Sequence, residues 1–303
     1  MQTILLNFFQ SIASPGLDFL AEGMTMLGET GVYILIIASF FWGISKKTGM
    51  ILSSTLLISL FLNNLLKIIF HSPRPFEVLD NLEGKRLETA TGYSFPSGHT
   101  QGASSFYTTL IYLFHNRMLR ILCILAILMV GISRLYLGVH WPVDVLGGWI
   151  LGITSAWMIA SLIDRLWEVP EKLDRFLLIF ILLVALAVMV MVLLELFLFK
   201  DSLKRDDFFK GSGLLLGCFT GFLVERRLTD FDASQGAPLL KILRVVIGLA
   251  GVALLQGGLK MLLPDVFFSH LLRYGIMGLW ITLFFPWFGC RIHLFSKRIL
   301  KEN

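Results

Sequence analysis

The amino-acid sequence predicts an all-α fold, a polytopic integral membrane helical bundle with about nine or ten transmembrane helices. Of its 303 residues, 56% are hydrophobic and only 16% are charged, and the mean hydropathy is +0.77. A soluble domain has about 25% charged residues. The apolar runs of roughly 17 to 25 residues are long enough to cross a hydrocarbon core of ~30 Å as helices. Strand-like alternation is too sparse for a membrane barrel.

The first element, residues 1–29, is a short apolar segment that reaches no clear span. Residues 4–9 are apolar, but four residues interrupt the run after them: Pro15, Gly16, Asp18 and Glu22. The segment fits an interfacial or re-entrant helix as well as a full crossing. We do not expect a removable signal peptide, because no basic stretch precedes an apolar core with a small-residue cleavage site.

The remaining apolar runs predict nine helices in chain order. We expect them at about 30–45, 49–70, 99–116, 119–137, 141–163, 176–199, 211–225, 239–263 and 267–290. A charged stretch around Pro170 separates the fifth helix from the sixth. The sequence therefore predicts an N-terminal segment (1–29), a catalytic bundle (30–163) and a further four-helix membrane region of unknown role (164–303).

Lysine and arginine predict the orientation of these helices. One side receives Lys46, Lys47, Arg117, Arg120, Arg165, Lys172, Arg175, Arg226, Arg227, Arg291, Lys297, Arg298 and Lys301. The other side receives the motif cations described below and Lys85, Arg86, Lys200, Lys204, Arg205 and Lys210. Because cytoplasmic loops are richer in Lys and Arg, the first side is placed in the cytoplasm. We expect a cell membrane protein (plasma or inner membrane) whose motifs lie on the extracytoplasmic face.

Charge and cysteine content exclude other classes of protein. The net charge is +5, but the cations lie at helix ends and in short loops rather than in a stripe, so no nucleic-acid partner is expected. Cys123, Cys218 and Cys290 are isolated in apolar surroundings and match no zinc spacing. We expect them to pack as small apolar residues.

The motif Ser133-Arg134-(five residues)-His140-(three residues)-Asp144 places a histidine four residues before an aspartate. On a helix this pair shares one face, so the carboxylate can accept a hydrogen bond from Nδ1 of His140 and leave Nε2 available for attack. Pro142 suits the first turn of a helix and therefore puts His140 at a helix entrance. A solvated pair at the membrane interface explains these two residues equally well.

The motif Pro96-Ser97-Gly98-His99 stands just before another apolar run. A hydroxyl, a glycine backbone and the first amides of a helix form an anion site at such a position. His99 then has a role as general acid for the leaving oxygen. A helix N-cap with a turn glycine explains Ser97 and Gly98 but leaves His99 without a purpose.

Three cations complete the set: Lys67 and Arg134 lie near the ends of apolar runs, and Arg74-Pro75 follows after a turn. A guanidinium matches phosphate oxygens in a bidentate manner, and lysine adds a point charge. Singly, each is an ordinary helix-end cation. Together they form the positive cage that a phosphoryl transition state requires.

The three motifs together resemble the signature of the type-2 phosphatidic acid phosphatase superfamily, and the resemblance covers residues 30–163. It implies that His140 is the nucleophile that forms a phosphohistidine, that Asp144 orients it, and that His99 protonates the leaving group. It also implies a phosphate site formed by Lys67, Arg74, Ser97, Gly98 and Arg134, and chemistry without metal or other cofactor. Among the branches of that superfamily, the membrane spans favour the lipid phosphatases over the soluble acid phosphatases and haloperoxidases.

The expected function is a membrane phosphatase that hydrolyses a lipid phosphomonoester or diphosphate at the bilayer. A lipid phosphotransferase with the same phosphoenzyme fits equally. A lipid-transport or partner-binding protein with a secondary phosphatase part is the third possibility. Undecaprenyl diphosphate, phosphatidic acid, phosphatidylglycerol phosphate and sphingoid phosphates all present the same group, so the substrate and the oligomeric state stay open. The charged 76–93 loop is either a reader of the head group or a solvated connector.

Overall fold

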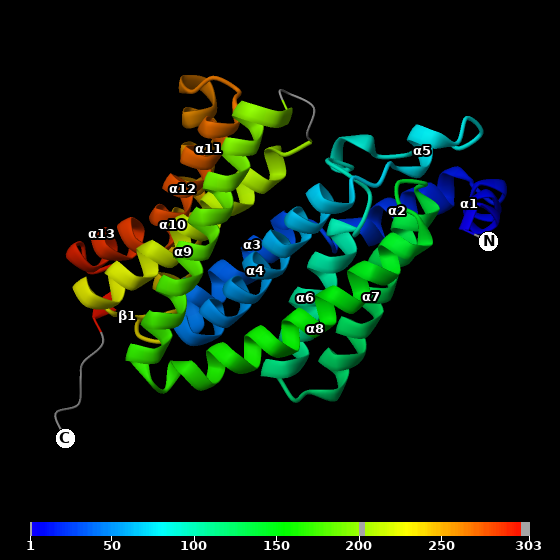
Figure 1. Ribbon diagram of the computed structural model, residues 1–303. Coiled ribbons are helices and arrows are strands. Elements are labelled where there is room, and N and C mark those ends of the chain that lie inside the picture. Colours follow the sequence, from blue (N-terminus) through cyan, green and yellow to red (C-terminus); the bar gives the residue numbers. More distant parts are fainter. Residues whose placement is uncertain (1, 200–203, 298–303) are drawn as a thin grey trace. The chain divides into compact units, whose positions relative to one another are not determined.

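The computed structural model describes residues 2–199 and 204–297, and it confirms the all-α membrane bundle. Lys200, Arg298 and Lys301, three of the cations used to orient the chain, lie outside the described residues. The helices appear in Figure 1. They are α1 (Gln2–Ser11), α2 (Pro15–Met26), α3 (Thr30–Ala38), α4 (Lys46–Phe70), α5 (Pro75–Val78), α6 (Gly98–Leu113), α7 (Arg117–Tyr136), α8 (Pro142–Trp167), α9 (Pro170–Leu194), α10 (Asp206–Leu228), α11 (Pro238–Leu262), α12 (Phe267–Leu279) and α13 (Phe285–Arg291).

Shorter elements join or extend these helices. They are the π-helical turns Ser39–Ile44, Glu195–Phe199 and Trp280–Phe284, a 3₁₀ turn at Leu87–Thr89, and the strands β1 (Phe231–Asp232) and β2 (Ser296–Lys297). The strands pair antiparallel, with Phe231 opposite Lys297. The sequence did not predict this two-stranded ribbon, because each strand is only two residues long.

Each of the nine predicted spans coincides with a helix. Within the described residues, eight helical stretches are long and apolar enough to cross a membrane. They run over Pro15–Ile44, Lys46–Val78, Arg117–Tyr136, Pro142–Trp167, Pro170–Phe197, Asp206–Leu228, Pro238–Leu262 and Phe267–Arg291. The ninth is α6, whose 16 residues make it the shortest of the set. The first stretch joins α2 to α3, so it continues the N-terminal segment into the first predicted span.

Proline and a polar cap explain several helix boundaries. α8, α9 and α11 each begin at a proline, whose fixed φ suits the first helical position and whose missing N–H costs nothing there. Asn116 caps α7, because its side chain accepts a hydrogen bond from the amide of Leu119 at 2.9 Å. These local signals place the ends of the helices, where the motif residues lie.

The chain divides into two compact units. The first comprises Met1–Ile34 and Ser54–Ser161, and the second comprises Leu35–Ser53 and Leu162–Asn303. The three domains that the sequence predicts, 1–29, 30–163 and 164–303, stay a prediction.

In the first unit, α6 is the central helix. Every residue of α6 from Thr100 to Leu110 is buried, and α6 packs against α7, which also receives α2. Polar side chains on α6 find partners inside the unit. Gln101 donates to the carbonyl of Ser59 at 2.8 Å and accepts from Asn63 at 2.9 Å. Such hydrogen bonds hold helices together where lipid provides no hydrophobic drive.

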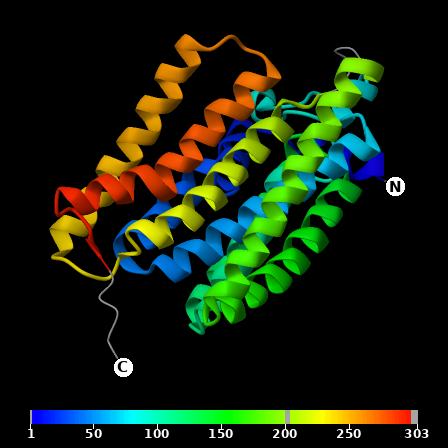
Figure 2. The same cartoon turned by 60° about the vertical axis from the view of Figure 1, so that its left-hand side comes forward.

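In the second unit, α10 packs along α12 (Figure 2). A buried ion-pair cluster lies at the start of α4 and the end of α10. The ammonium of Lys46 is 2.5 Å from a carboxylate oxygen of Glu225 and 2.8 Å from Asp230. Other polar side chains of this unit also have partners. Here Gln256 contacts Tyr274 across α11 and α12, and Arg273 contacts His270 within α12.

Candidate active site

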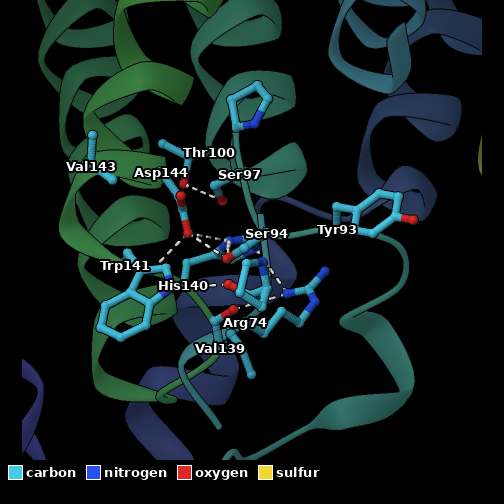
Figure 3. A network of polar contacts seen from close by, with 12 residues as sticks. Arg74, Tyr93, Ser94, Ser97, Thr100, Val139, His140, Trp141, Val143 and Asp144 are labelled. Carbon is cyan, nitrogen blue, oxygen red and sulfur yellow. Dashed lines mark hydrogen bonds and ion pairs between the residues drawn. The ribbon is translucent and has the colours of Figure 1, made fainter. Parts of the chain in front are cut away.

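All eight predicted site residues lie at helix ends of the first unit. Lys67 is near the end of α4, Arg74 precedes α5, Ser97 precedes α6, Gly98 and His99 open α6, Arg134 is in the last turn of α7, His140 precedes α8 and Asp144 is in the first turn of α8. Figure 3 shows how Arg74, Ser97, His140 and Asp144 gather. Segments far apart in the sequence therefore contribute to one buried polar region.

His140, Asp144 and Ser94 form the centre of the network in Figure 3. Nδ1 of His140 lies 3.4 Å from Oδ2 of Asp144, as the four-residue spacing predicts. The hydroxyl of Ser94 donates to the same oxygen at 2.5 Å and is 3.4 Å from Nδ1 of His140. The amide of Trp141 adds a third contact to Oδ2 at 2.8 Å. The carboxylate is thus held on the Nδ1 side of the imidazole.

Arg74 lies on the opposite side of the imidazole. Its Nη1 is 3.3 Å from Nε2 of His140 and donates to the carbonyl of Val139 at 2.9 Å. Further backbone carbonyls orient the same guanidinium, since Nε donates to Gly92 and Nη2 to Thr91. A phosphoryl group attacked by Nε2 would therefore lie against a guanidinium whose direction is already set.

Lys67 and Arg134 are buried cations held by neutral oxygens. The ammonium of Lys67 donates to the carbonyl of Tyr93 at 2.5 Å and to that of Thr91 at 3.4 Å. Nη1 of Arg134 donates to the hydroxyl of Thr25 at 3.0 Å, and the Arg134 side chain is 0% exposed. A neutral oxygen orients a cation without cancelling its charge.

A backbone hydrogen bond connects the motif that contains Ser97 to the motif that contains Asp144. The amide of Ser97 donates to the carbonyl of Asp144 at 3.1 Å. The Ser97 hydroxyl makes no capping bond to the first amides of α6 and instead accepts from the hydroxyl of Thr100 at 2.9 Å. The N-cap interpretation of Ser97 is therefore wrong for its side chain.

Gly148 explains how α8 comes close enough to α6 for this contact. A Cβ at Gly148 would lie 2.9 Å from Cβ of Thr100 and 3.0 Å from the carbonyl oxygen of Ser97. Both distances are shorter than ordinary van der Waals contact, so a larger residue would force the two motifs apart. A glycine on α8 is thus part of the site's architecture.

Positive charge surrounds both histidines. Arg74, Arg134 and Lys67 all lie within electrostatic range of His140 and of His99. Burial first, and these charges second, lower the pKa of His140 well below its ordinary value. His140 is therefore neutral near pH 7, and a neutral imidazole with one hydrogen-bonded nitrogen can act as a nucleophile through the other.

Sequence reasoning missed several residues of this network. They are Ser94, the carbonyl groups of Thr91, Gly92 and Tyr93, and the hydroxyl of Thr25. Proximity to Pro96-Ser97 was a usable signal for Ser94 and the carbonyl groups, which precede that motif by only a few residues. No signal marked Thr25, which lies in the interrupted N-terminal segment.

No group of three or more His, Cys, Asp or Glu side chains suited to hold a metal ion occurs in the described part of the chain. The groups that hold the site together are the Asp144 carboxylate, the His140 imidazole, three cations, hydroxyls and backbone carbonyls. The expectation of chemistry without metal or cofactor stays a prediction.

Two stretches of the chain match known families. Residues 48–168 match the PAP2 superfamily, and residues 209–298 match the description "PAP2 superfamily phosphatase, transmembrane extension". The first match contains all eight predicted site residues. The second lies in the part of the chain whose role the sequence analysis left unknown.

Named relatives are similar over part of the chain. Phosphatidylglycerophosphatase B of Bacillus subtilis is 28% identical over 53% of this chain and 82% of its own length. An undecaprenyl-diphosphatase of Sulfolobus acidocaldarius is 37% identical over 36% of this chain and 52% of its own length. The crystal structure of a transmembrane PAP2-type phosphatidylglycerolphosphate phosphatase from Bacillus subtilis covers 54% of this chain and 84% of its own, with 28% identity and a TM-score of 0.46.

Proposed function

The chain belongs to the membrane lipid phosphatases of the PAP2 superfamily, and from this premise we propose that it hydrolyses a lipid phosphomonoester or diphosphate through a phosphohistidine. The proposed nucleophile is Nε2 of His140. The proposed phosphate ligands are Lys67, Arg74, Ser97, Gly98 and Arg134. Asp144 orients the nucleophile, and His99 serves as general acid and then as general base.

One observation carries this proposal: the two nitrogens of His140 face opposite kinds of group. Nδ1 lies 3.4 Å from the carboxylate of Asp144, while Nε2 lies 3.3 Å from the guanidinium of Arg74. The carboxylate favours the tautomer with the proton on Nδ1, which leaves a lone pair on Nε2. The guanidinium stabilises negative charge where a phosphoryl group would meet that lone pair.

The reaction has two steps in one site. In the first, Nε2 of His140 forms a bond to phosphorus, the bond from phosphorus to the lipid oxygen breaks, and His99 gives that oxygen a proton. In the second, His99 takes a proton from water, the water oxygen attacks phosphorus, and the phosphorus–nitrogen bond breaks. Inorganic phosphate leaves, and both histidines return to their starting state. The three cations stabilise the charge on the phosphoryl oxygens in both transition states.

The substrate head group approaches from the membrane surface on the extracytoplasmic side of a cell membrane. The site residues lie at helix ends, and the excess of Lys and Arg on the other side of the predicted topology supports this face. The lipid tail remains among the apolar helices while its phosphate reaches the cations.

Phosphate release from purified protein tests the proposal. We would assay detergent-purified protein in EDTA with an isoprenyl diphosphate, phosphatidic acid, phosphatidylglycerol phosphate, a sphingoid phosphate and a soluble phosphoester. His140→Ala is the test variant. His115→Ala is the matched control, because His115 is an exposed histidine between α6 and α7, in the loop after the far end of α6.

We expect wild type and His115→Ala to release phosphate from at least one lipid, and His140→Ala to lose this activity by a factor of at least about 10³. Labelled phosphate should be trapped on the wild type and be absent from His140→Ala. Near-normal turnover by His140→Ala would refute the nucleophile. Label recovered on an organic acceptor instead of as inorganic phosphate would refute hydrolysis in favour of phosphoryl transfer.

A further inference from the structure

Among the described residues, Arg134 has a hydrogen-bond partner at one of its three nitrogens. Nη1 donates to the hydroxyl of Thr25 at 3.0 Å. Within the part of the chain that the structure describes, the buried atoms Nε and Nη2 have no hydrogen-bond partner. Burying a charged donor without a partner is costly, so these two atoms indicate a ligand. They also form one edge of the guanidinium, the edge that can bind two oxygens of a phosphate side by side.

Thr25 belongs to α2, in the segment that sequence analysis could not assign. Its side chain is 0% exposed, and α2 packs against α7, the helix that carries Arg134. Residue 25 lies outside the stretch 48–168 that matches the PAP2 superfamily. The contact therefore brings a residue from outside that stretch to one of the motif cations.

The turn after α2 meets both motif helices. A Cβ at Gly28 would lie 2.7 Å from Cγ1 of Val130 on α7 and 3.4 Å from the carbonyl oxygen of His99 on α6. Only a residue without a side chain allows so close an approach. This packing sets the position of the α2 end relative to His99 and Arg134, and Thr25 lies in its last turn.

We propose that Thr25 is a positioning residue of the phosphate site: it holds Nη1 of Arg134 so that Nε and Nη2 face the phosphoryl group of the bound lipid. This inference rests on the proposed function for the identity of the anion. A hydroxyl suits the task because it directs the guanidinium without neutralising it, whereas a carboxylate in its place would compete with phosphate for the same charge. The N-terminal helices then complete the active site.

The test compares variants of the full-length protein in two measurements. Thr25→Val removes the hydroxyl and keeps the shape, and Thr25→Ser keeps the hydroxyl. Tyr136→Phe is the matched control, because the Tyr136 hydroxyl also ties α7 to α2, through Asp18 at 2.6 Å, without touching a motif cation. We would measure kcat and KM in mixed micelles and, separately, the binding of inorganic phosphate by titration calorimetry.

We expect Thr25→Val to weaken phosphate binding and lower kcat/KM by about 10- to 100-fold, the usual range for losing a hydrogen bond to a charged group. Thr25→Ser should restore both to within about threefold, and Tyr136→Phe should leave both near wild type. In an Arg134→Met background, Thr25→Val should cause no further loss, because a residue that acts through another has no effect without it.

Three results would overturn the inference: unchanged phosphate binding in Thr25→Val, an equal loss in Tyr136→Phe, or a full additional loss on top of Arg134→Met. Titration calorimetry tests the positioning role of Thr25 independently of the proposed hydrolytic function, because it measures phosphate binding without turnover. If wild type releases no phosphate from any lipid but binds inorganic phosphate in a Thr25-dependent manner, the hydrolytic function fails and the positioning role stands.

Discussion

Buried and partly buried cations of the two units differ in the groups that hold them. In the first unit, Lys67, Arg74 and Arg134 donate to backbone carbonyls and to a threonine hydroxyl. In the second unit, carboxylates hold Lys46, Arg205 and Arg226, through Glu225, Glu195 and Asp174 respectively. A carbonyl directs a cation and leaves its charge in place, whereas a carboxylate neutralises it. The first arrangement suits a site for an anion, and the second suits a structural tie between helices.

Arg244 is an exception in the second unit, because carbonyls rather than carboxylates hold it. It is fully buried in the second unit, and it donates to the carbonyls of Leu294 and Ala233. Its guanidinium also lies 4.8 Å from the centre of the Phe295 ring, whose negative face offsets part of the charge. Carbonyl ligands alone therefore do not identify an anion site. The neighbouring histidine, carboxylate and helix ends distinguish the first unit.

Among the changes that test this comparison of the two units, Arg134→Met should have the largest effect. We expect kcat to fall by about 10²- to 10³-fold, as when a donor to transition-state charge is removed. We also expect the thermal midpoint to stay unchanged or rise, because methionine removes a desolvated charge and two buried donors without partners. Phosphate release and thermal unfolding in detergent measure the two quantities. A large drop in thermal midpoint would show that Arg134 ties helices together. It would contradict the proposed difference between the cations of the two units.

Lys46→Met should have the opposite effect to Arg134→Met: a loss of stability with activity retained. It leaves the fully buried Glu225 without its cation, so the free energy of unfolding should fall by about 3–5 kcal/mol. Activity per folded molecule should be retained, because Lys46 belongs to the second unit. Titration with a denaturing detergent measures the stability, and Lys46→Met combined with Glu225→Gln should recover most of it. Loss of activity in the folded fraction would argue against a purely structural tie.

The smallest effect is a shift of the pH profile. Burial and the charges of Arg74, Arg134 and Lys67 lower the pKa of His140. The nucleophile therefore stays neutral at pH values below about 6.5, the ordinary pKa of a histidine. The acid limb of kcat/KM should therefore begin below that pH, with turnover lost as pH falls through the lowered pKa. Lys67→Met removes one positive charge, so its acid limb should move to higher pH.

Substrate phosphate itself titrates near pH ~6, and this contribution cancels in the ratio of the Lys67→Met and wild-type profiles. The ratio should decrease as pH falls from 8 towards 5, in a range set by the pKa of His140. A ratio independent of pH would mean that the charge of Lys67 does not affect the pKa of His140.

The apolar runs of the sequence were sufficient to predict the helices. They were not sufficient to predict the hydrogen-bond partners of the site residues. Each predicted span coincides with a helix, because an apolar run of that length has few other stable forms in a membrane. The spacing of His140 and Asp144 also predicted their contact, and the structure makes it with His140 two residues before α8 and Asp144 in its first turn. The carbonyl ligands of Lys67 and Arg74 were not predictable, because every residue carries a carbonyl and only the path of the 91–93 segment decides which ones face a cation.

The sequence by itself determined the membrane-spanning helices, the three motifs and the pairing of residues close in the chain, because these depend on hydropathy and on helical spacing. Only the tertiary structure decided which carbonyls and hydroxyls hold the motif residues, that Gly148 lets α8 approach α6, and that Thr25 of α2 holds Arg134 of α7. The last contact joins residues 109 positions apart. No local pattern encodes such a pair, because it results from how whole helices pack against one another.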